Sequence, residues 1–372
     1  MLQKTRFDCV VFGSSVLQKG ALRKGWLALR DGIVVDAGNG RVPPAKLQID
    51  AGGDAVGPAF VDTHIHGYGG HDASDCGDPE HGESALRAMA RSLLKAGVGA
   101  FCPTLYPLDP DITIQCLKTI ANVRRNQQID ESIIIGAHLE GPFVNPMRAG
   151  ALEIAKILTP NLKLAETFID TGAVSIMTIA PELKNTKSIM EACVRSGIIV
   201  SIGHSAATLA ECKQACLHGA SSITHLFNAM PPFHHRDFSI VNFALLEPGF
   251  PTELIGDLQH VGAPAIDVLI RTRGLDGIRL VSDNLAAAGT RVTKFKAGGH
   301  RLTVKNGIVY RAGGGIAGSC RSLASSVSGL SRTGLLTLEE AWRMASAEPA
   351  RFVRPAAIRG FARIPLTEVV ES

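Results

Sequence analysis

The sequence lacks the features of several non-enzymatic protein classes. No apolar run reaches the roughly 18 residues that a membrane-spanning helix needs, and the start, MLQKTRFDCVVFGSS, has no apolar core followed by a small-residue cleavage site. No run of five like charges occurs, and the formal net charge is only +4. A nucleic-acid or membrane-surface protein is therefore not indicated. The expectation is a soluble cytoplasmic protein, whose mild positive excess fits an anionic small-molecule substrate.

Cysteine pairs with metal-binding or redox spacing are also missing. The eight cysteines include no CxxC motif, and the nearest two, Cys212 and Cys216, lie on a helix-like stretch. Free thiols in a reducing compartment are therefore favoured over a disulfide or a cysteine metal site.

What the sequence does contain is a series of eight short apolar segments that end in polar residues. They cover residues 57–66, 97–104, 132–140, 173–182, 197–205, 221–228, 252–260 and 277–284. Segments with helical periodicity lie between most of them, and two of these, 83–97 and 185–197, close on a glycine suited to a helix C-cap. Eight apolar strands alternating with helices predict an α/β fold, a TIM-like (β/α)8 barrel.

The two ends of the sequence have a different pattern. Residues 1–56 alternate short strands with glycine turns and predict an antiparallel module, and a hairpin pattern at 299–315 is expected to pair with it. A helix is predicted over 337–353, where Thr337 and Glu340 have capping-box spacing. The predicted domains are the first part of a small β-sandwich (1–56), the barrel (57–298), and a last segment (299–372) with the sandwich hairpin, a return to the barrel and the C-terminal helix.

Polar side chains at the ends of the apolar segments form the candidate site. His64 and His66 project together, because residues i and i+2 of a strand point the same way. The carboxyl ends of barrel strands meet at one mouth, where barrel enzymes keep their chemistry. The other strand-end residues are Glu140, His204, His225, His260 and Asp283. Residues away from strand ends are expected in loops or on helix surfaces: His71, His81, His218, His234, His235, Asp237 and His300.

These residue types indicate metal-assisted hydrolysis. Glu140, His204 and His225 supply one oxygen and two nitrogens, the ligand set of a catalytic divalent metal, and His64 with His66 would complete a second site. A bound metal lowers the pKa of its water toward ~7 and polarises a carbonyl oxygen. Asp283 is then the natural general base, and it can pass the same proton to a leaving amine. Satisfied strand-end histidines and a turn-capping aspartate are the alternatives.

The motifs FVDTHIHG, HLEGPFVNP, IGHS, THLFNAM, LVSDN and AGS occur in this order in the chain. In this order and spacing they resemble the amidohydrolase superfamily and, within it, the N-acetylglucosamine-6-phosphate deacetylase family, over about residues 8–352. The resemblance implies a metal-dependent barrel with a small β-sandwich that removes acetate from an N-acetyl amino sugar phosphate. It also implies a homodimer and one or two divalent ions, zinc first, with iron, manganese or cobalt as alternatives.

The resemblance assigns roles to single residues. Glu140, His204 and His225 match the principal metal ligands. His64 and His66 match a pair that holds a second metal in some members, and Asp283 matches the catalytic acid/base. Positions that match substrate contacts are Asn228, Ala229, His260, Ala151, Leu152, Ile316, Ala317 and Gly318, and Arg236 matches an arginine that reaches the phosphate from the neighbouring subunit.

Several positions depart from the family pattern. Leu152 stands where the family usually has a substrate-binding histidine, and leucine cannot make that hydrogen bond. Leu258 replaces a glycine, Asn284 stands where alanine is common, and Arg321 stands where an apolar residue is usual. The closing strands of the sandwich are expected to be absent or degenerate in residues 355–372.

Three functions follow from this pattern. The first is deacetylation of N-acetylglucosamine 6-phosphate. The second is the same reaction on another N-acyl amine, such as N-acetylgalactosamine 6-phosphate or an N-acyl amino acid, which Leu152, Leu258 and Arg321 favour. The third is a catalytically silent barrel that acts as a binding or assembly subunit. Cyclic-amide hydrolysis is disfavoured, because the segment 173–182 ends in TIAPE without the lysine that such enzymes use.

Overall fold

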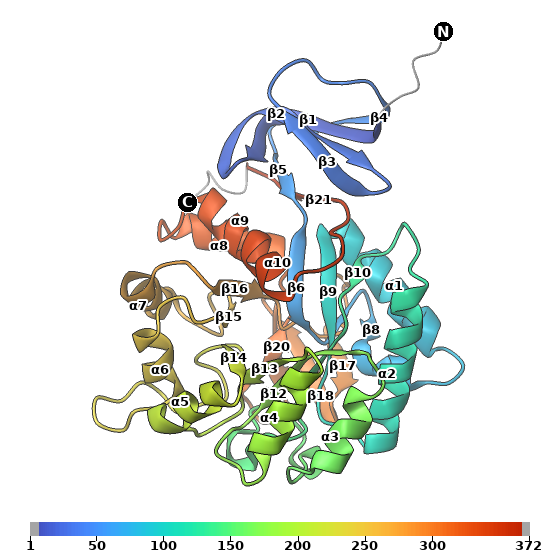
Figure 1. Ribbon diagram of the computed structural model, residues 1–372. Coiled ribbons are helices and arrows are strands. Elements are labelled where there is room, and N and C mark those ends of the chain that lie inside the picture. Colours follow the sequence, from blue (N-terminus) through green and yellow to red (C-terminus); the bar gives the residue numbers. More distant parts are fainter. Residues whose placement is uncertain (1–6, 367–372) are drawn as a thin grey trace.

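The barrel predicted from the sequence is present in the computed structural model, which describes residues 7–366 (Figure 1). Its eight parallel strands are β6 (Phe60–Ile65), β9 (Val98–Leu105), β11 (Ala137–Glu140), β12 (Val174–Ile179), β13 (Ile199–Ile202), β14 (Ala220–Ile223), β15 (Thr252–Ile255) and β16 (Ile278–Val281). Each lies on one of the eight predicted segments, and neighbours pair in chain order, with the short β10 (Ile133–Ile134) also pairing with β9.

The barrel closes between its last strand and its first. The backbone N–H of Asp283, just past β16, donates to the carbonyl of His64 in β6 at 3.0 Å. The backbone N–H of Ser282 donates to Oδ1 of Asp62 at 3.2 Å. The two ends of the chain segment that forms the barrel are therefore joined at the level of the candidate site.

Helices cover the outside of the barrel (Figure 1). They are α1 (Gly82–Lys95), α2 (Pro110–Arg125), α3 (Leu162–Ile169), α4 (Thr186–Arg195), α5 (Leu209–Leu217), α6 (Ile240–Leu246), α7 (Ala263–Arg273) and α8 (Leu323–Arg332). The predicted capping box is confirmed, because Thr337 caps α9 (Leu338–Ala345) and Glu340 returns the bond. The predicted long helix is divided at Ser346, after which α10 (Ala347–Val353) begins. Within residues 7–366, no helix combines the length and apolarity needed to cross a membrane.

A mixed sheet lies at the end of the barrel where β6 begins (Figure 1). Its strands are β1 (Phe7–Gln18), β2 (Ala21–Arg30), β3 (Ile33–Gly38), β4 (Ala45–Asp50), β5 (Ala55–Pro58) and β21 (Phe361–Ile364). The expectation of a purely antiparallel module is wrong, because β4 and β5 both pair with β1 in parallel. The sheet joins both ends of the chain through the antiparallel pair of β21 and β5. One closing strand is thus present, and residues 367–372 lie outside the described part.

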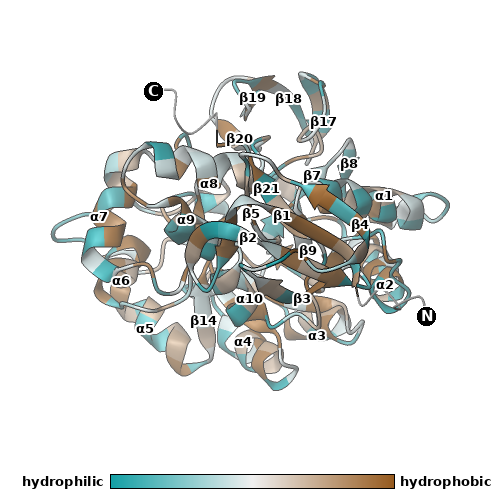
Figure 2. Ribbon diagram, turned by 90° about the horizontal axis from the view of Figure 1, so that it is seen from above, coloured by the Kyte–Doolittle hydropathy of each residue, from teal (hydrophilic) through white to brown (hydrophobic). Residues whose placement is uncertain are grey.

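The segment after β16 forms a second, separate sheet of four strands. They are β17 (Lys294–Ala297), β18 (His300–Lys305), β19 (Ile308–Arg311) and β20 (Ile316–Ser319). Figures 1 and 2 both show this sheet away from β1–β5, so the prediction that residues 299–315 pair with the N-terminal strands is wrong. The physical reason is that Ser319 exchanges backbone hydrogen bonds with Asp283 and Leu285, which holds the sheet at the carboxyl ends of the barrel strands.

Candidate active site

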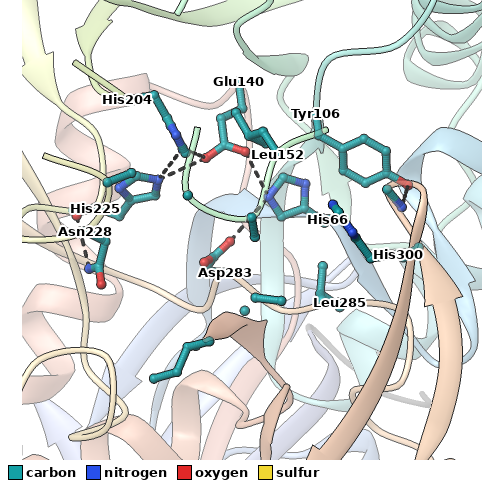
Figure 3. A pocket seen from close by; sticks show the side chains of 18 of the residues that line it. His66, Tyr106, Glu140, Leu152, His204, His225, Asn228, Asp283, Leu285 and His300 are labelled. Atoms are coloured by element: carbon teal, nitrogen blue, oxygen red, sulfur yellow. Dashed lines mark hydrogen bonds and ion pairs between the residues drawn. The ribbon is translucent and has the colours of Figure 1, made fainter. Parts of the chain in front are cut away.

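A pocket opens at the carboxyl ends of the barrel strands, with a volume of about 160 Å³ (Figure 3). Residues of two kinds line it. The strand-end wall consists of His66, Glu140, His204, His225, Asn228, Ala229, His260 and Asp283. The hairpin wall consists of Tyr106, residues 150–153, Leu285, Ala297, Gly298, His300, Leu302 and residues 316–318.

Three of the strand-end side chains project from an unusual backbone conformation. The φ angles of His204, His225 and Asp283 are 46°, 24° and 49°, in the left-handed region that residues other than glycine seldom adopt. Each such residue costs about 1–3 kcal/mol, and such residues cluster at active sites. The strands β13, β14 and β16 thus end in turns that hold these three side chains over the barrel mouth.

Glu140, His204 and His225 meet at one point. Oε1 of Glu140 lies 2.9 Å from Nε2 of His204 and 2.9 Å from Nε2 of His225. The two Nε2 atoms are 3.1 Å apart. All three side chains are buried, and Figure 3 shows them directed toward one another.

His64, His66 and Asp283 form a second group beside the first. The Nε2 atoms of His64 and His66 are 3.3 Å apart, and Oδ1 of Asp283 lies 3.3 Å from Nε2 of His66. Nε2 of His64 is also 3.4 Å from Oε1 of Glu140. Glu140 therefore lies between the two groups. The ligand atoms of His64, Glu140 and His225, and those of His64, His66 and Asp283, lie close enough together to share a metal ion.

Hydrogen bonds on the outer side of the imidazoles decide which nitrogen is free. Nδ1 of His204 lies 2.9 Å from the carbonyl of Arg148, Nδ1 of His66 lies 3.2 Å from that of Thr104, and Nδ1 of His64 lies 3.1 Å from Oε2 of Glu253. In the neutral form that can bind a cation, each of these rings donates its Nδ1 proton to the oxygen, so that its Nε2 lone pair is directed into the pocket. Such convergent lone pairs fit a divalent cation.

The carboxylates of the cluster are held in the charged form. Burial by itself would raise the pKa of Glu140, but the imidazoles of His204 and His64 outweigh it and hold that pKa well below its usual range. Burial likewise opposes a lower pKa for Asp283, but the hydrogen bond to His66 and the charge of His64 lower it. Both side chains are therefore anionic at neutral pH and attract a cation.

Two buried polar residues beneath the site were not singled out from the sequence. Glu253 in β15 accepts hydrogen bonds from Thr63 and His64. Burial raises its pKa, but His64, His138 and Arg279 outweigh burial and lower the pKa to about 2. His138 in β11 lies between the Thr63 carbonyl and the Thr178 hydroxyl, and burial lowers its pKa to about 3. The sequence does contain a signal that could have identified Glu253, because a carboxylate is unusual within the apolar segment TELIG.

The structure brings most of the expected substrate-binding residues into this pocket. Asn228, Ala229 and His260 lie in the strand-end wall, and His260 donates from Nδ1 to Asp257 at 2.7 Å. The remaining expected contacts lie in the hairpin wall: Ala151, Leu152, Ile316, Ala317 and Gly318. Arg236 does not line this chain's own pocket and is exposed on the loop before α6.

The residues that differ from the family pattern lie at different distances from the pocket. Leu152 lines it and packs with Val144, Ala149 and Tyr106. Arg321 does not line it, and its guanidinium donates to the carbonyl of Asn306 instead. His300, which the sequence placed on a loop or helix surface, is instead part of the hairpin wall.

Comparison with known proteins gives a consistent result for sequence and for structure. A model of the amidohydrolase family matches residues 55–355. The N-acetylglucosamine-6-phosphate deacetylases of Lysinibacillus sphaericus and Bacillus subtilis (strain 168) are each 32% identical to the chain, over 306 and 313 residues. Both matches cover 82% of this chain, and they cover 78% and 77% of the two relatives.

Solved structures extend the similarity to almost the whole chain. A mutant N-acetyl-D-glucosamine-6-phosphate deacetylase from Mycobacterium smegmatis, in complex with N-acetyl-D-glucosamine-6-phosphate, is 28% identical with a TM-score of 0.83, covering 95% of this chain and 92% of that one. The deacetylase of Thermotoga maritima, at 24% identity, has a TM-score of 0.80 over 95% of this chain and 93% of its own, which shows the same fold.

Proposed function

This chain belongs to the amidohydrolase family, and we propose that it hydrolyses the acetamide of N-acetylglucosamine 6-phosphate to glucosamine 6-phosphate and acetate. The observation that carries the proposal is the convergence of Glu140, His204, His225 and Asp283 on one pocket, in a chain whose relatives carry this name. The catalytically silent alternative is set aside, because this cluster is complete.

The cluster would hold one or two divalent ions. Glu140, His204 and His225 are the proposed principal ligands, and His64 with His66 would hold a second ion. Imidazole and carboxylate ligands suit zinc first, with iron, manganese or cobalt as alternatives. When bound, such an ion supplies a water of lowered pKa and polarises the acyl carbonyl.

Asp283 is the proposed general base and acid. Its lowered pKa keeps it ionised at neutral pH, so it can accept a proton from the attacking water. It can then deliver that proton to the leaving amine. Asp283 is held in place by its left-handed backbone conformation and by the hydrogen bond from its N–H to the carbonyl of His64. Its Oδ1 atom therefore lies 3.3 Å from Nε2 of His66.

The phosphate end of the substrate is assigned to the side of the pocket that carries Asn228 and Ala229. The Asn228 side chain, the Ala229 backbone and the His260 imidazole are the proposed contacts within the chain. Arg236 is exposed on a loop that also carries exposed Phe233 and Phe238. We therefore assign Arg236 to the phosphate of a second subunit's substrate, which requires a homodimer.

The thiols support a reducing location. All eight cysteines are free, and those at positions 76, 102, 116, 193 and 212 are buried. Such usage fits a cytoplasmic protein, because disulfides form and persist mainly in oxidising compartments.

An acetate-release screen tests the function. Purified protein, with its metal content measured, is given N-acetylglucosamine 6-phosphate, N-acetylgalactosamine 6-phosphate, unphosphorylated N-acetylglucosamine and N-acyl amino acids. We expect the highest kcat/KM with N-acetylglucosamine 6-phosphate. Preference for an N-acyl amino acid would instead assign the enzyme to the second function, which the apolar Leu152 in the pocket wall favours.

A further inference from the structure

The hairpin wall carries a polar group that the proposed reaction has not yet used. Nε2 of His300 is buried and has no hydrogen-bond partner among the described residues. A buried polar nitrogen left without a partner costs about 1–3 kcal/mol, so native structures seldom keep one unless a ligand or water completes it. His300 lines the pocket, and Figure 3 shows it on the same side as Tyr106 and His66, across from His204 and His225.

Leu152 gives the same wall an apolar side chain. This side chain is only 9% exposed, lines the pocket, and is packed in an apolar cluster with Val144 and Ala149. It offers the substrate no hydrogen bond. The wall therefore holds one apolar side chain where a hydrogen bond was expected and one unpaired imidazole nitrogen that was not expected there.

The backbone that carries His300 is fixed in place. Gly298 and Gly299, with φ angles of 52° and 76°, form the two-residue turn between paired Ala297 and His300. The N–H of Gly298 donates to the hydroxyl of Tyr106 at 3.2 Å. That hydroxyl donates in turn to Oδ1 of Asp72 at 3.1 Å.

A second contact holds the turn against the loop that contains Leu152. A Cβ placed on Gly299 would lie 2.5 Å from Oε2 of Glu153, so the turn lies directly against this side chain. The tip of the β17–β18 hairpin thus rests on the residue next to Leu152. The His300 imidazole thus lines the same pocket as Leu152 from a turn whose backbone is fixed, so it loses little freedom when a ligand binds.

From this arrangement we infer that His300 is a substrate-contacting residue, whose Nε2 hydrogen-bonds to an oxygen of the N-acylated sugar. It thereby supplies from the hairpin the contact that Leu152 cannot make from the loop. The inference rests on the proposed deacetylase function and adds a residue that determines its specificity. It also explains how an apolar Leu152 is compatible with a sugar substrate.

The test compares four variants with the wild-type holoenzyme, each checked for metal content and Tm. Removal of a buried hydrogen bond should lower kcat/KM for N-acetylglucosamine 6-phosphate about 10- to 100-fold in His300→Ala. His300→Gln, which keeps a donor near the Nε2 position, should retain more activity than His300→Ala. Arg301→Ala is the matched control, because Arg301 is the exposed next residue of β18 and does not line the pocket; it should behave as wild type.

The double variant Leu152→His/His300→Ala asks whether the two positions serve one contact. It should recover part of the activity that His300→Ala loses. Should His300→Ala fold poorly, His300→Phe, which keeps a ring but has neither nitrogen, replaces it. Unchanged kcat/KM and unchanged calorimetric affinity for glucosamine 6-phosphate in His300→Phe would overturn the inference. Equal kcat/KM in well-folded His300→Ala and Arg301→Ala would overturn it as well. Wild-type protein that releases no acetate from this sugar phosphate would instead overturn the proposed function together with the inference.

Discussion

The two walls of the pocket are built in different ways. The strand-end wall takes its residues from the ends of barrel strands, and four of them have left-handed φ angles. Backbone oxygens of Arg148 and Thr104 orient its imidazoles of His204 and His66. The hairpin wall comes from a loop and an antiparallel sheet outside the barrel, and it is mainly apolar. Under the proposed function, the strand-end wall would carry the reacting groups together with the contacts of Asn228, Ala229 and His260, and the hairpin wall would add contacts to the acylated sugar.

The largest effect is expected from the strand-end wall, in Asp283→Asn. Loss of the general base should lower kcat by roughly three to four orders of magnitude, because proton transfer is then left to water. The metal content that we assign to Glu140, His204 and His225 should be unchanged, as measured by elemental analysis. Asp237→Asn, a change on the exposed loop before α6, is the control, and near-normal kcat in Asp283→Asn would contradict the assigned role.

The second-largest effect is expected on metal binding, in His204→Ala. This change removes one of three convergent donors, so bound metal per chain should fall to well below one and activity should fall with it. Elemental analysis after dialysis measures the loss, with exposed His235→Ala as the control. Full occupancy in His204→Ala would mean that the ligands were assigned wrongly.

An intermediate effect is expected from Arg236→Ala. Loss of a charge-assisted hydrogen bond to phosphate should raise KM about 10- to 100-fold for phosphorylated substrates and leave kcat nearly unchanged. Unphosphorylated N-acetylglucosamine should show little difference. An equal rise in KM for both substrates would show that the arginine has another role.

Mixed dimers of two impaired variants test whether Arg236 acts in the pocket of the neighbouring subunit. If Arg236 serves the pocket of a neighbouring subunit, a mixed dimer of Asp283→Asn and Arg236→Ala chains contains one site with both defects and one intact site. Activity at low substrate concentration should then exceed the average of the two parents. No gain after subunit exchange would place Arg236 outside the partner's site.

The smallest effect is expected on stability, from His260→Gln. Burial opposes protonation of His260, but the hydrogen bond and charge of Asp257 outweigh it and raise its pKa above the usual 6.5. The charged pair therefore stabilises the fold fully below about pH 6, and this contribution is lost as the pH rises through the raised pKa. The Tm difference between wild type and His260→Gln should shrink from pH 5.5 to pH 9, and a difference that grows with pH would contradict this assignment.

The strand-end wall was largely predictable from the sequence. In a parallel barrel, every strand end points to one mouth, so the position of Glu140, His204, His225 and Asp283 in the fold follows from the order of strands and helices alone. The local pattern could not reveal Glu253, because a single buried carboxylate in an apolar strand becomes meaningful only when His64 is found against it.

The hairpin wall was not predictable in the same way. An antiparallel hairpin carries no local signal for the sheet it will join, and residues 299–315 pair only within their own sheet of four strands among the described residues. The place of His300 depends on tertiary contacts of the turn, from Gly298 to Tyr106 and from Gly299 to Glu153. Sequence position alone therefore assigned His300 to the surface.

The separate β17–β20 sheet has a consequence for how such an enzyme diversifies. The sheet is bonded to the chain that follows β16 through Ser319 of β20, whereas β17 and β18 pair within their own sheet. Mutations in the β17–β18 turn therefore leave the hydrogen-bond ladder of the barrel undisturbed. Substitutions at a few neighbouring positions of this turn can then change the hairpin wall, while the residues at the barrel strand ends stay the same. Exchanging this hairpin between relatives offers a direct route to engineered deacylases with altered preference.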